Sequence, residues 1–444
     1  MCAEDMNSER DDSKVTKESF KDYTYVMVST LNQMVNYIPL KHFSFKEVVN
    51  ITVEVPKDDK GDKKIKYFDN DKWDENLKSV YKDKTIVDIK MDEKNFYSLT
   101  SVQNKLIKEL DDGNLKCKKI FWNITGGQRH IMMAIHQVVK RGDVICYLEG
   151  NNNQMMVYNV ATNLTTPIDY ALDLEKDLTM DMALQLMGLQ FNSSNSEIGK
   201  DEERKFYKSF YDIYTTNKNL REWLIILNKN YPKMRNQKKK ESDQDYASYK
   251  TQYPTNKQTY AALKATAKGK IKEILSSLDQ KMLDKKLNRN QAFGYILEEL
   301  TFYKIEELVK DKKVTLLHSL KVKDTTINNL TVAEFDIALL TNNGKFIMFE
   351  CKSGVMDGDT AKARKYVTYA VSGVYGLPIL INPLLSTDTT QSDIVKDLDI
   401  DIYKYIKEAE GAARRADLEV WGLDEIGGID NKIERSKLKK YIEL

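Results

Sequence analysis

The sequence of 444 residues predicts two α/β domains separated by a helical region. Between residues 21 and 165, short β-rich runs alternate with amphipathic helical stretches, a pattern typical of a largely parallel sheet covered by helices. From 166 to 285 the composition shifts to helix-forming residues with few glycines. From 286 to 444 a long helix, a hairpin and a short buried run predict a separate α/β domain. A chain of this length with 41% hydrophobic residues can bury more than one core.

Composition restricts the class of function only weakly. The 69 basic and 67 acidic residues give a net charge of +2, so any contact with nucleic acid must use local patches. The four cysteines lack CxxC or metal-ligand spacing, which favours free thiols in a reducing compartment. No run approaches the roughly 18 apolar residues that a membrane span needs. We therefore expect a cytoplasmic protein without a membrane segment, whose charged residues 1–20 form a disordered tail.

Strands of the first domain are predicted from runs such as YTYVMVST (23–30), KKIFWNIT (118–125) and DVICYLEG (143–150). Helices are predicted from Ser98 to Leu110 and from Gly127 to Lys140. A Thr-Gly-Gly turn precedes the second helix, so backbone N–H groups should point out of a helix N-terminus, where anions bind. Thr125 could cap this helix or donate its hydroxyl to a ligand. Because a Gly-Gly turn also serves geometry alone, the motif by itself does not assign a ligand site.

A hairpin is predicted in the second domain, with residues 342–344 as its turn and Gly344 in a left-handed conformation. Counting outward from this turn places Leu340 opposite Phe346, Leu339 opposite Ile347 and Ile337 opposite Phe349. In the same register Asp336 lies opposite Glu350, with Lys352 on the same face. The other face is predicted to carry Phe335, Ile337 and Leu339 together with Ile347, Phe349 and Cys351.

Two opposed carboxylates repel each other unless something positive lies between them. A divalent ion such as Mg²⁺ or Mn²⁺ prefers oxygen ligands of this kind. Lys352 could then orient or deprotonate a water molecule, or stabilise the charge that develops in phosphodiester hydrolysis. The same residues would also suit an ion-pair ladder on the wet face of a sheet. Spacing alone leaves both interpretations open.

The order of a helix with glutamate, then Asp336, a hairpin and FECKSG (349–354) resembles the PD-(D/E)XK nuclease family. The resemblance implies that Asp336, Glu350 and the backbone carbonyl of Cys351 bind the metal. It also implies that Lys352 serves catalysis, that Mn²⁺ or Mg²⁺ is the cofactor, and that DNA or RNA is the substrate.

A helical glutamate often completes the set of metal-binding and catalytic residues in this family. In GYILEEL (294–300), Glu298 matches the family position best and Glu299 is the rival. Helical phase does not decide between them, because both flank the same apolar stripe. The resemblance therefore implies Glu298 as a fourth catalytic and metal-binding residue, with Glu299 still open.

The Thr-Gly-Gly turn, the hairpin YLEGNNNQMMVYN (147–159) and the segment DMALQLMG (181–188) resemble CRISPR-associated Rossmann (CARF) sensor domains. From about residue 21 to its end, the chain resembles the Can2 and Card1 group of CARF nucleases in type III CRISPR antiviral defence. This resemblance implies a Rossmann-like domain, a restriction-endonuclease-like α/β domain, and a homodimer activated by a cyclic oligoadenylate, usually the tetramer. By the same resemblance the ligand pocket is lined by Ser29, Thr30, Asn32, Thr125, Gly126, Gly127, Gln128 and Arg129.

Two other functions stay open. Gln128 and Arg129 stand where the group more often has a Thr-Lys pair, so contacts to phosphate are expected to differ. A restriction-type DNA endonuclease would read DNA with its N-terminal domain, although no basic recognition helix is evident. A catalytically silent nucleotide-binding scaffold would not need intact Asp336, Glu350 and Lys352.

Overall fold

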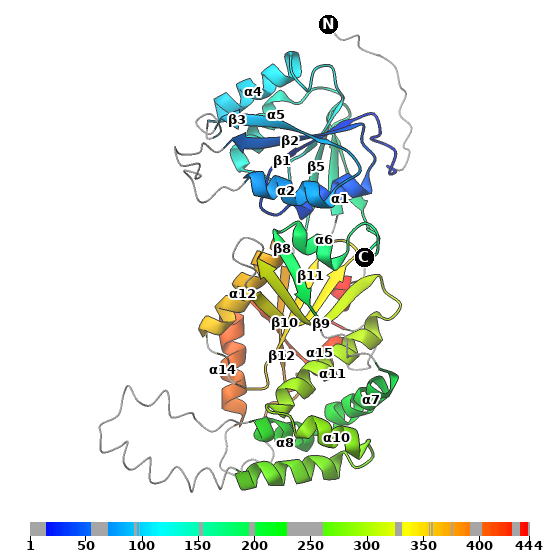
Figure 1. Cartoon of the computed structure of the whole chain (residues 1–444), viewed down its shortest axis with the longest axis vertical. Helices are drawn as coiled ribbons and strands as arrows, with labels where there is room; N and C mark the ends of the chain where they lie inside the picture. Colours follow the sequence, from blue (N-terminus) through cyan, green and yellow to red (C-terminus); the bar gives the residue numbers. More distant parts are fainter. Residues whose placement is uncertain are drawn as a thin grey trace, which may run out of the picture.

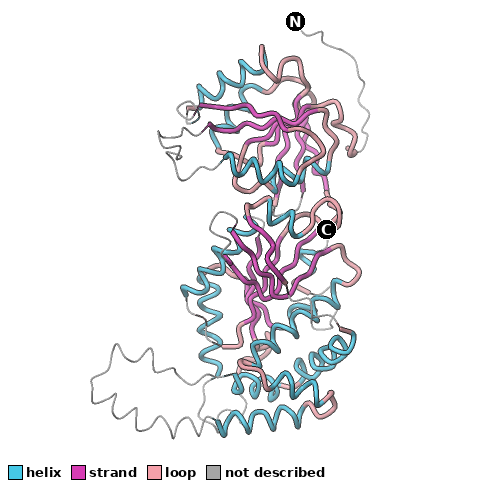
Figure 2. Tube along the Cα trace, viewed as in Figure 1, coloured by secondary structure: helices cyan, strands magenta, loops and turns pink. Residues whose placement is uncertain are grey.

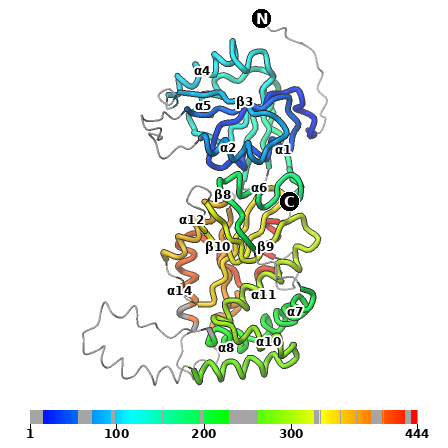
Figure 3. Tube along the Cα trace, in the orientation of Figure 1, coloured from blue at the N-terminus to red at the C-terminus, as the bar shows by residue number. Residues whose placement is uncertain are grey.

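The computed structural model describes residues 15–54, 70–92, 96, 98–150, 154–194, 200–228, 261–324, 331–354, 356, 358–373, 376–390, 402–428 and 436–442. Two sheets lie one above the other along the long axis of the molecule, each packed against helices (Figures 1 and 2). The chain completes the first sheet, blue to green, before it enters the second (Figure 3). No helix within these ranges is both long and apolar enough to cross a membrane.

The first domain contains a seven-stranded sheet in the order β3-β2-β1-β4-β5-β6-β7. Its strands are β1 (Thr24–Val28), β2 (Glu47–Glu54), β3 (Ile86–Asp92), β4 (Ile120–Asn123), β5 (Val144–Glu149), β6 (Gln154–Asn159) and β7 (Leu164–Asp169). Neighbours from β3 to β5 are parallel, whereas β6 and β7 are added antiparallel. The strand order reverses between β1 and β4, and such a switch point leaves a crevice at the carboxyl ends of the strands.

Helices cover both faces of this sheet. They are α1 (Met34–His42), α2 (Asn70–Val80), α4 (Leu99–Asp111), α5 (Arg129–Val138) and α6 (Met180–Gln185). α4 and α5 share a core with Val26 and Val28, whereas α1, α2 and α6 share the opposite core with Tyr25 and Met27. The alternation of β1 decides which core each side chain enters. α4 begins where predicted because the Ser98 hydroxyl accepts the N–H of Ser101.

The N-terminal segment is anchored earlier than expected. Residues 1–14 of the expected tail lie outside the described part of the chain. Phe20 is buried, and its ring lies edge-on to Phe43 and Phe121 with ring centroids 4.9 and 4.8 Å away. A buried aromatic side chain contributes enough apolar surface to hold a short charged segment against the core.

The cysteines differ in state. Cys146 and Cys351 are free and buried thiols. Cys117 is disulfide-bonded, so the expectation of four free thiols is wrong for this residue. Spacing along the chain shows only whether neighbouring cysteines can pair, and it says nothing about cysteines far apart in sequence.

The second domain contains a six-stranded sheet in the order β13-β12-β11-β10-β9-β8. Its strands are β8 (Leu189–Ser193), β9 (Val314–Asp324), β10 (Thr331–Thr341), β11 (Phe346–Cys351), β12 (Gly376–Asn382) and β13 (Glu419–Gly422). Its helices are α7 (Asp201–Thr216), α8 (Lys218–Asn228), α10 (Gln280–Leu287), α11 (Ala292–Val309), α12 (Gly358–Ser372), α14 (Ile402–Arg415), α15 (Leu423–Gly427) and α16 (Lys439–Ile442). Residues 261–274 form a further helix.

Much of the region that was expected to connect the domains belongs to the second one. β8 pairs antiparallel with β9, at the edge of the second sheet. Phe206, Phe210 and Tyr214 of α7 share one buried core with α11 and with Ile337 of β10. Their spacing along α7 forms an apolar stripe that must be buried, but composition alone does not reveal which domain buries it.

One hydrophobic core joins the two domains. Leu340 of β10 lies in the same buried cluster as Met34 and Ile38 of α1. A Cβ atom placed on Gly344 would lie 3.0 Å from Cδ1 of Ile38. Nearby, the Leu172 N–H donates to a carbonyl in the hairpin turn at 2.7 Å. The tip of the β10–β11 hairpin therefore rests on the first domain.

Candidate functional site

The β10–β11 hairpin has the predicted register. Three predicted pairs are confirmed, namely Leu340 with Phe346, Leu339 with Ile347, and Ile337 with Phe349. Gly344 adopts the predicted left-handed conformation with φ of +81°. The regular pairing ends at Ile337. The predicted pair of Asp336 and Glu350 across the ladder is therefore absent from the described hairpin. Instead the N–H of Cys351 donates to Oδ2 of Asp336 at 2.7 Å.

The predicted alternation of side chains is wrong at Asp336. Phe335 lies in the core that joins the domains, whereas Ile337 lies in the core beneath α11. On the neighbouring strand β9, Ser319 lies between the residues that pair with Phe335 and Ile337, and its φ is +50°. Side chains alternate only while the backbone stays extended, so this left-handed residue interrupts the alternation of β9 at the level where β10 also changes faces.

Glu350 lies close enough to Asp336 and Glu298 for its charge to raise the pKa of both. Burial, followed by the charge of Glu350, raises the pKa of Asp336 to about 7, although the Cys351 N–H opposes the shift. Burial, followed by the charges of Asp336 and Glu350, raises the pKa of Glu298 on α11 to about 8. The acidic residues predicted from the sequence therefore form one cluster, the carboxyl cluster, of Glu298, Asp336 and Glu350. Several buried carboxyl groups held this close together favour a nearby positive charge.

Two cations face Glu350. Its side chain is 6% exposed, and Oε1 lies 2.7 Å from Nζ of Lys352 and 3.1 Å from Nε of Arg364. Neither carboxylate oxygen accepts a hydrogen bond of good geometry, although both are buried. Burial lowers the pKa of Lys352, but the carboxylates of Glu350 and Asp336 outweigh burial and raise it above its usual value. Lys352 is therefore protonated, which favours charge stabilisation over deprotonation of a water molecule.

The structure separates the two neighbouring glutamates of α11. Glu299 is buried, with Nζ of Lys286 and Nη1 of Arg289 each 3.0 Å from its carboxylate. It also accepts a hydrogen bond from the Tyr207 hydroxyl of α7. These contacts hold α11 to the helices around it. Glu299 is therefore part of a buried ion network, whereas Glu298 lies with the carboxyl cluster.

The donor set suits a hard divalent ion, although its members are not arranged around one. Among the described residues, no three Asp, Glu, His or Cys side chains converge as metal ligands would. Glu350 faces Lys352 and Arg364, while Asp336 is held by a backbone N–H. Carboxylate and carbonyl oxygens are the ligands that Mg²⁺ and Mn²⁺ prefer. Among the described residues Oε2 of Glu350 is buried without a hydrogen-bond donor, and such an ion would satisfy it.

A second cluster of predicted residues lies at the switch point of the first sheet. β1 and β4 are parallel neighbours, so Ser29 and Thr125, which follow them, lie at the same edge. A Cβ atom placed on Gly126 would lie 2.9 Å from Cγ2 of Thr30. Residues 29–32 and 125–129 are therefore brought together, and that they line a ligand pocket stays a prediction. We call them the ligand edge.

The helix after the Thr-Gly-Gly turn starts later than predicted. α5 begins at Arg129, with Gln128 as its N-cap and no side-chain cap. Gly127 has φ of +88°, and a Cβ atom there would lie 2.5 Å from Cγ1 of Val28. Among the described residues, the N–H groups of residues 126–128 have no acceptor. Arg129 is exposed and makes no ion pair within the same part of the chain.

Asn123 is a residue of this edge that the sequence analysis missed. Its Oδ1 accepts both the N–H and the hydroxyl of Thr125, at 3.1 and 2.7 Å. The Thr125 hydroxyl in turn accepts the N–H of Leu148 at 2.8 Å. Of the two roles considered for Thr125, that of helix cap is wrong, because Gln128 is the N-cap and the Thr125 hydroxyl donates to Asn123 within the turn. The sequence feature that could have identified Asn123 is a polar residue at the end of an apolar strand.

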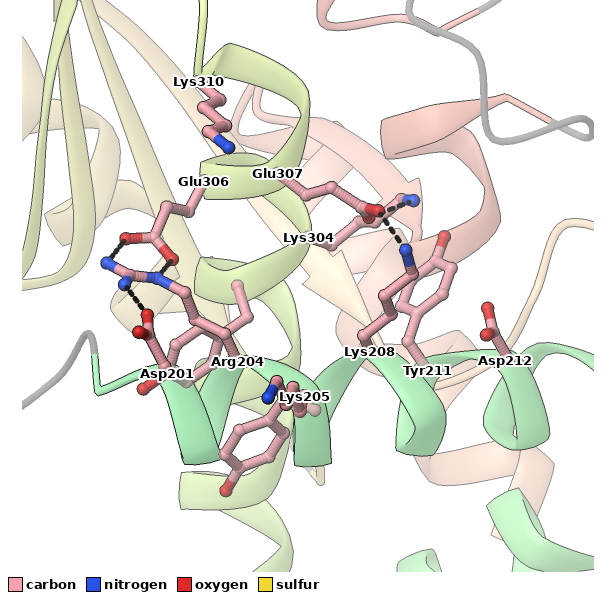
Figure 4. Close-up of a pocket in the computed structure, with 12 residues that line it drawn as sticks. Asp201, Arg204, Lys205, Lys208, Tyr211, Asp212, Lys304, Glu306, Glu307 and Lys310 are labelled. Atoms are coloured by element: carbon pink, nitrogen blue, oxygen red, sulfur yellow. Dashed lines mark hydrogen bonds and ion pairs between the residues drawn. The ribbon is translucent and has the colours of Figure 1, made fainter.

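A groove between α7 and α11 is a separate concavity of about 700 Å³. Figure 4 shows that its charged walls pair across it, with Arg204 2.9 Å from Glu306 and Lys208 3.5 Å from Glu307. None of its lining residues belongs to the carboxyl cluster or the ligand edge. The groove is therefore not assigned to the candidate site.

The two sheets define a class of two-domain proteins in which a Rossmann-like domain precedes a restriction-endonuclease-like α/β domain, which confirms the predicted fold class. VC1899 from Vibrio cholerae shares this fold at 14% identity and a TM-score of 0.60, over 95% of this chain and 98% of that one. Can2 from Sulfobacillus thermosulfidooxidans, solved in complex with cyclic tetra-adenylate, shares it at 12% identity and a TM-score of 0.55, over 90% and 93%. No family model and no curated protein matches the chain.

Proposed function

We propose that this protein is a nuclease that uses Mg²⁺ or Mn²⁺ to hydrolyse phosphodiester bonds of DNA or RNA. The observation that carries the proposal is the carboxyl cluster, in which buried Glu350 and the N–H of Cys351 lie at the end of the hairpin beside Asp336. The charge of Glu350 adds to the raised pKa of both Asp336 and Glu298. Glu298, Asp336, Glu350 and the carbonyl of Cys351 would hold the ion. A bound divalent ion supplies positive charge to phosphoryl oxygens and lowers the pKa of water. Protonated Lys352 would stabilise negative charge on the scissile phosphate.

The proposed activator is a cyclic oligoadenylate bound at the ligand edge of a homodimer. The N–H groups without acceptors at residues 126–128, and the exposed Arg129, suit a phosphate. Leu31 and Met133 are 54% and 57% exposed beside this edge, as expected of side chains that a second copy would cover. One ring on a two-fold axis could contact both edges at once. This function would place the protein in type III CRISPR antiviral defence in the cytoplasm.

The core that joins the domains supplies a route between the two sites. Asn32 of the ligand edge precedes α1, and its Oδ1 accepts the N–H of Met34 at 3.2 Å. The same helix packs on the tip of the hairpin whose other end carries the carboxyl cluster. A ligand that binds one position of residues 29–32 better than another would bias the position of α1 and of the hairpin.

The decisive experiment is cleavage of labelled single- and double-stranded DNA and RNA, with each metal, and with and without cyclic tetra- or hexa-adenylate. Ligand-dependent cleavage would support the proposed function. Ligand-independent cleavage of specific double-stranded sites would favour a restriction-type endonuclease. Ligand binding with no cleavage of any substrate would favour a silent scaffold.

Metal removal should silence the enzyme. A chelator is expected to reduce cleavage to background, and excess Mn²⁺ or Mg²⁺ should restore it. The reason is that the proposed hydrolysis requires a divalent ion held by the carboxyl cluster. Ligand binding measured in the same samples should be unchanged, since the ligand edge lies in the other domain. Cleavage that persists at full rate in chelator would rule out the proposed chemistry.

The adjacent glutamates of α11 provide a matched pair of variants. Glu298→Gln should lower cleavage about 10-fold or more and leave stability intact, because its raised pKa means that the ionised group is disfavoured in the folded protein. Glu299→Gln should destabilise the fold by about 1–3 kcal/mol, because it leaves buried Lys286 with Glu203 as its one remaining carboxylate among the described residues and removes the carboxylate beside Arg289. Urea unfolding and initial rates of cleavage would be measured on both proteins. The reverse pattern would exchange the roles assigned to the two residues.

A further inference from the structure

Arg364 is a cation at the carboxyl cluster that no sequence pattern indicated. It lies on α12, with Nε 3.1 Å from Oε1 of Glu350. Its Nη1 donates to the backbone carbonyl of Glu334 at 3.1 Å, so the guanidinium is also anchored to β10. The side chain is 30% exposed, so it reaches both the buried carboxylate and solvent.

The Glu350 carboxylate therefore has two cationic partners. A buried carboxylate needs a partner, and Lys352 already provides one at 2.7 Å. An ion held by Glu350 would have to compete with the guanidinium of Arg364 for the same oxygen. Once displaced, the guanidinium would stay tethered to the Glu334 carbonyl, beside the metal. Its planar fork of donors matches the oxygens of a phosphodiester.

We propose that Arg364 is a substrate-binding residue that occupies the Glu350 carboxylate in the metal-free protein and contacts the substrate phosphate when a divalent ion is bound. This inference rests on the proposed metal-dependent nuclease function. It distinguishes Arg364 from its neighbour on the helix, Lys365, which is ion-paired with Asp417 at 2.8 Å. Lys365 therefore serves as the matched control.

The test is calorimetric titration of Mn²⁺ into the full chain without nucleic acid, followed by cleavage kinetics. Arg364→Ala should bind Mn²⁺ about 10-fold more tightly, because the internal competitor is gone. The same variant should cleave about 10- to 100-fold less efficiently through a higher KM, because a charged contact to phosphate is lost. Arg364→Lys should lie between Arg364→Ala and the unchanged protein in both measurements, and Lys365→Ala should match the unchanged protein.

A purely structural role for Arg364 would lower metal affinity and cleavage together, so tighter metal binding with weaker cleavage is specific to the proposal. Unchanged or weaker Mn²⁺ binding by both Arg364 variants would overturn it. Failure of the underlying function has a different signature, in which the unchanged protein binds no Mn²⁺ and cleaves no substrate.

Discussion

Asp336→Asn and Glu350→Gln are each expected to lower cleavage by on the order of 10³-fold or more, because each removes a charged metal ligand while preserving side-chain shape. Lys352→Ala should have a comparable effect through loss of the positive charge beside the scissile phosphate. Initial rates would be measured with saturating Mn²⁺ and activator. Binding of cyclic tetra-adenylate should be unchanged in all three proteins, since the ligand edge lies in the other domain.

The control for these variants is Glu334→Gln. Glu334 lies two residues before Asp336, and its side chain is 50% exposed and 3.6 Å from Lys321. An exposed pair of this kind contributes little, so cleavage and stability should match the unchanged protein. Metal-dependent cleavage at the unchanged rate by both Asp336→Asn and Glu350→Gln would place the active site elsewhere.

Gly126→Asp is expected to abolish activation by cyclic oligoadenylate while basal, metal-dependent cleavage remains. The new Cβ would lie 2.9 Å from Thr30 and 3.3 Å from Val35, and the carboxylate would bring negative charge to the N–H groups of the turn. Calorimetry should show one ligand per two chains for the unchanged protein, and no detectable binding for this variant. Cleavage with and without ligand would then be compared.

Gly269→Asp is the matched control, because a Cβ atom on Gly269 meets no atom within 4 Å outside the backbone of its own helix. Since Gly126 is tightly packed, thermal unfolding must accompany the binding measurement. Arg129→Ala provides a second variant without this complication, as its exposed side chain makes no ion pair within the described residues. We expect about 10-fold weaker ligand binding from loss of one charge-assisted contact to phosphate. Undiminished binding by both variants would place the sensor pocket elsewhere.

The sequence by itself determined those features that depend on neighbours along the chain. Turn chemistry at residues 342–344 and the apolar strands on either side are enough to set the hairpin register up to Ile337. The Thr-Gly-Gly turn after an apolar strand likewise located one half of the ligand edge. Such features are local, because the backbone conformation of a turn or a strand favours particular residue types whatever packs against it.

Only the tertiary structure decided which side chains meet. Glu298 and Glu299 are equivalent in helical phase, and they are separated only because Lys286 and Arg289 surround the second of them. Arg364 lies in a polar helix without any motif, and it reaches Glu350 of β11 only because α12 packs against the neighbouring strand β12. The reversal of faces at Asp336 lies beside a left-handed residue of another strand, Ser319. Each of these outcomes is set by elements distant in sequence, and local residue preferences carry no information about them.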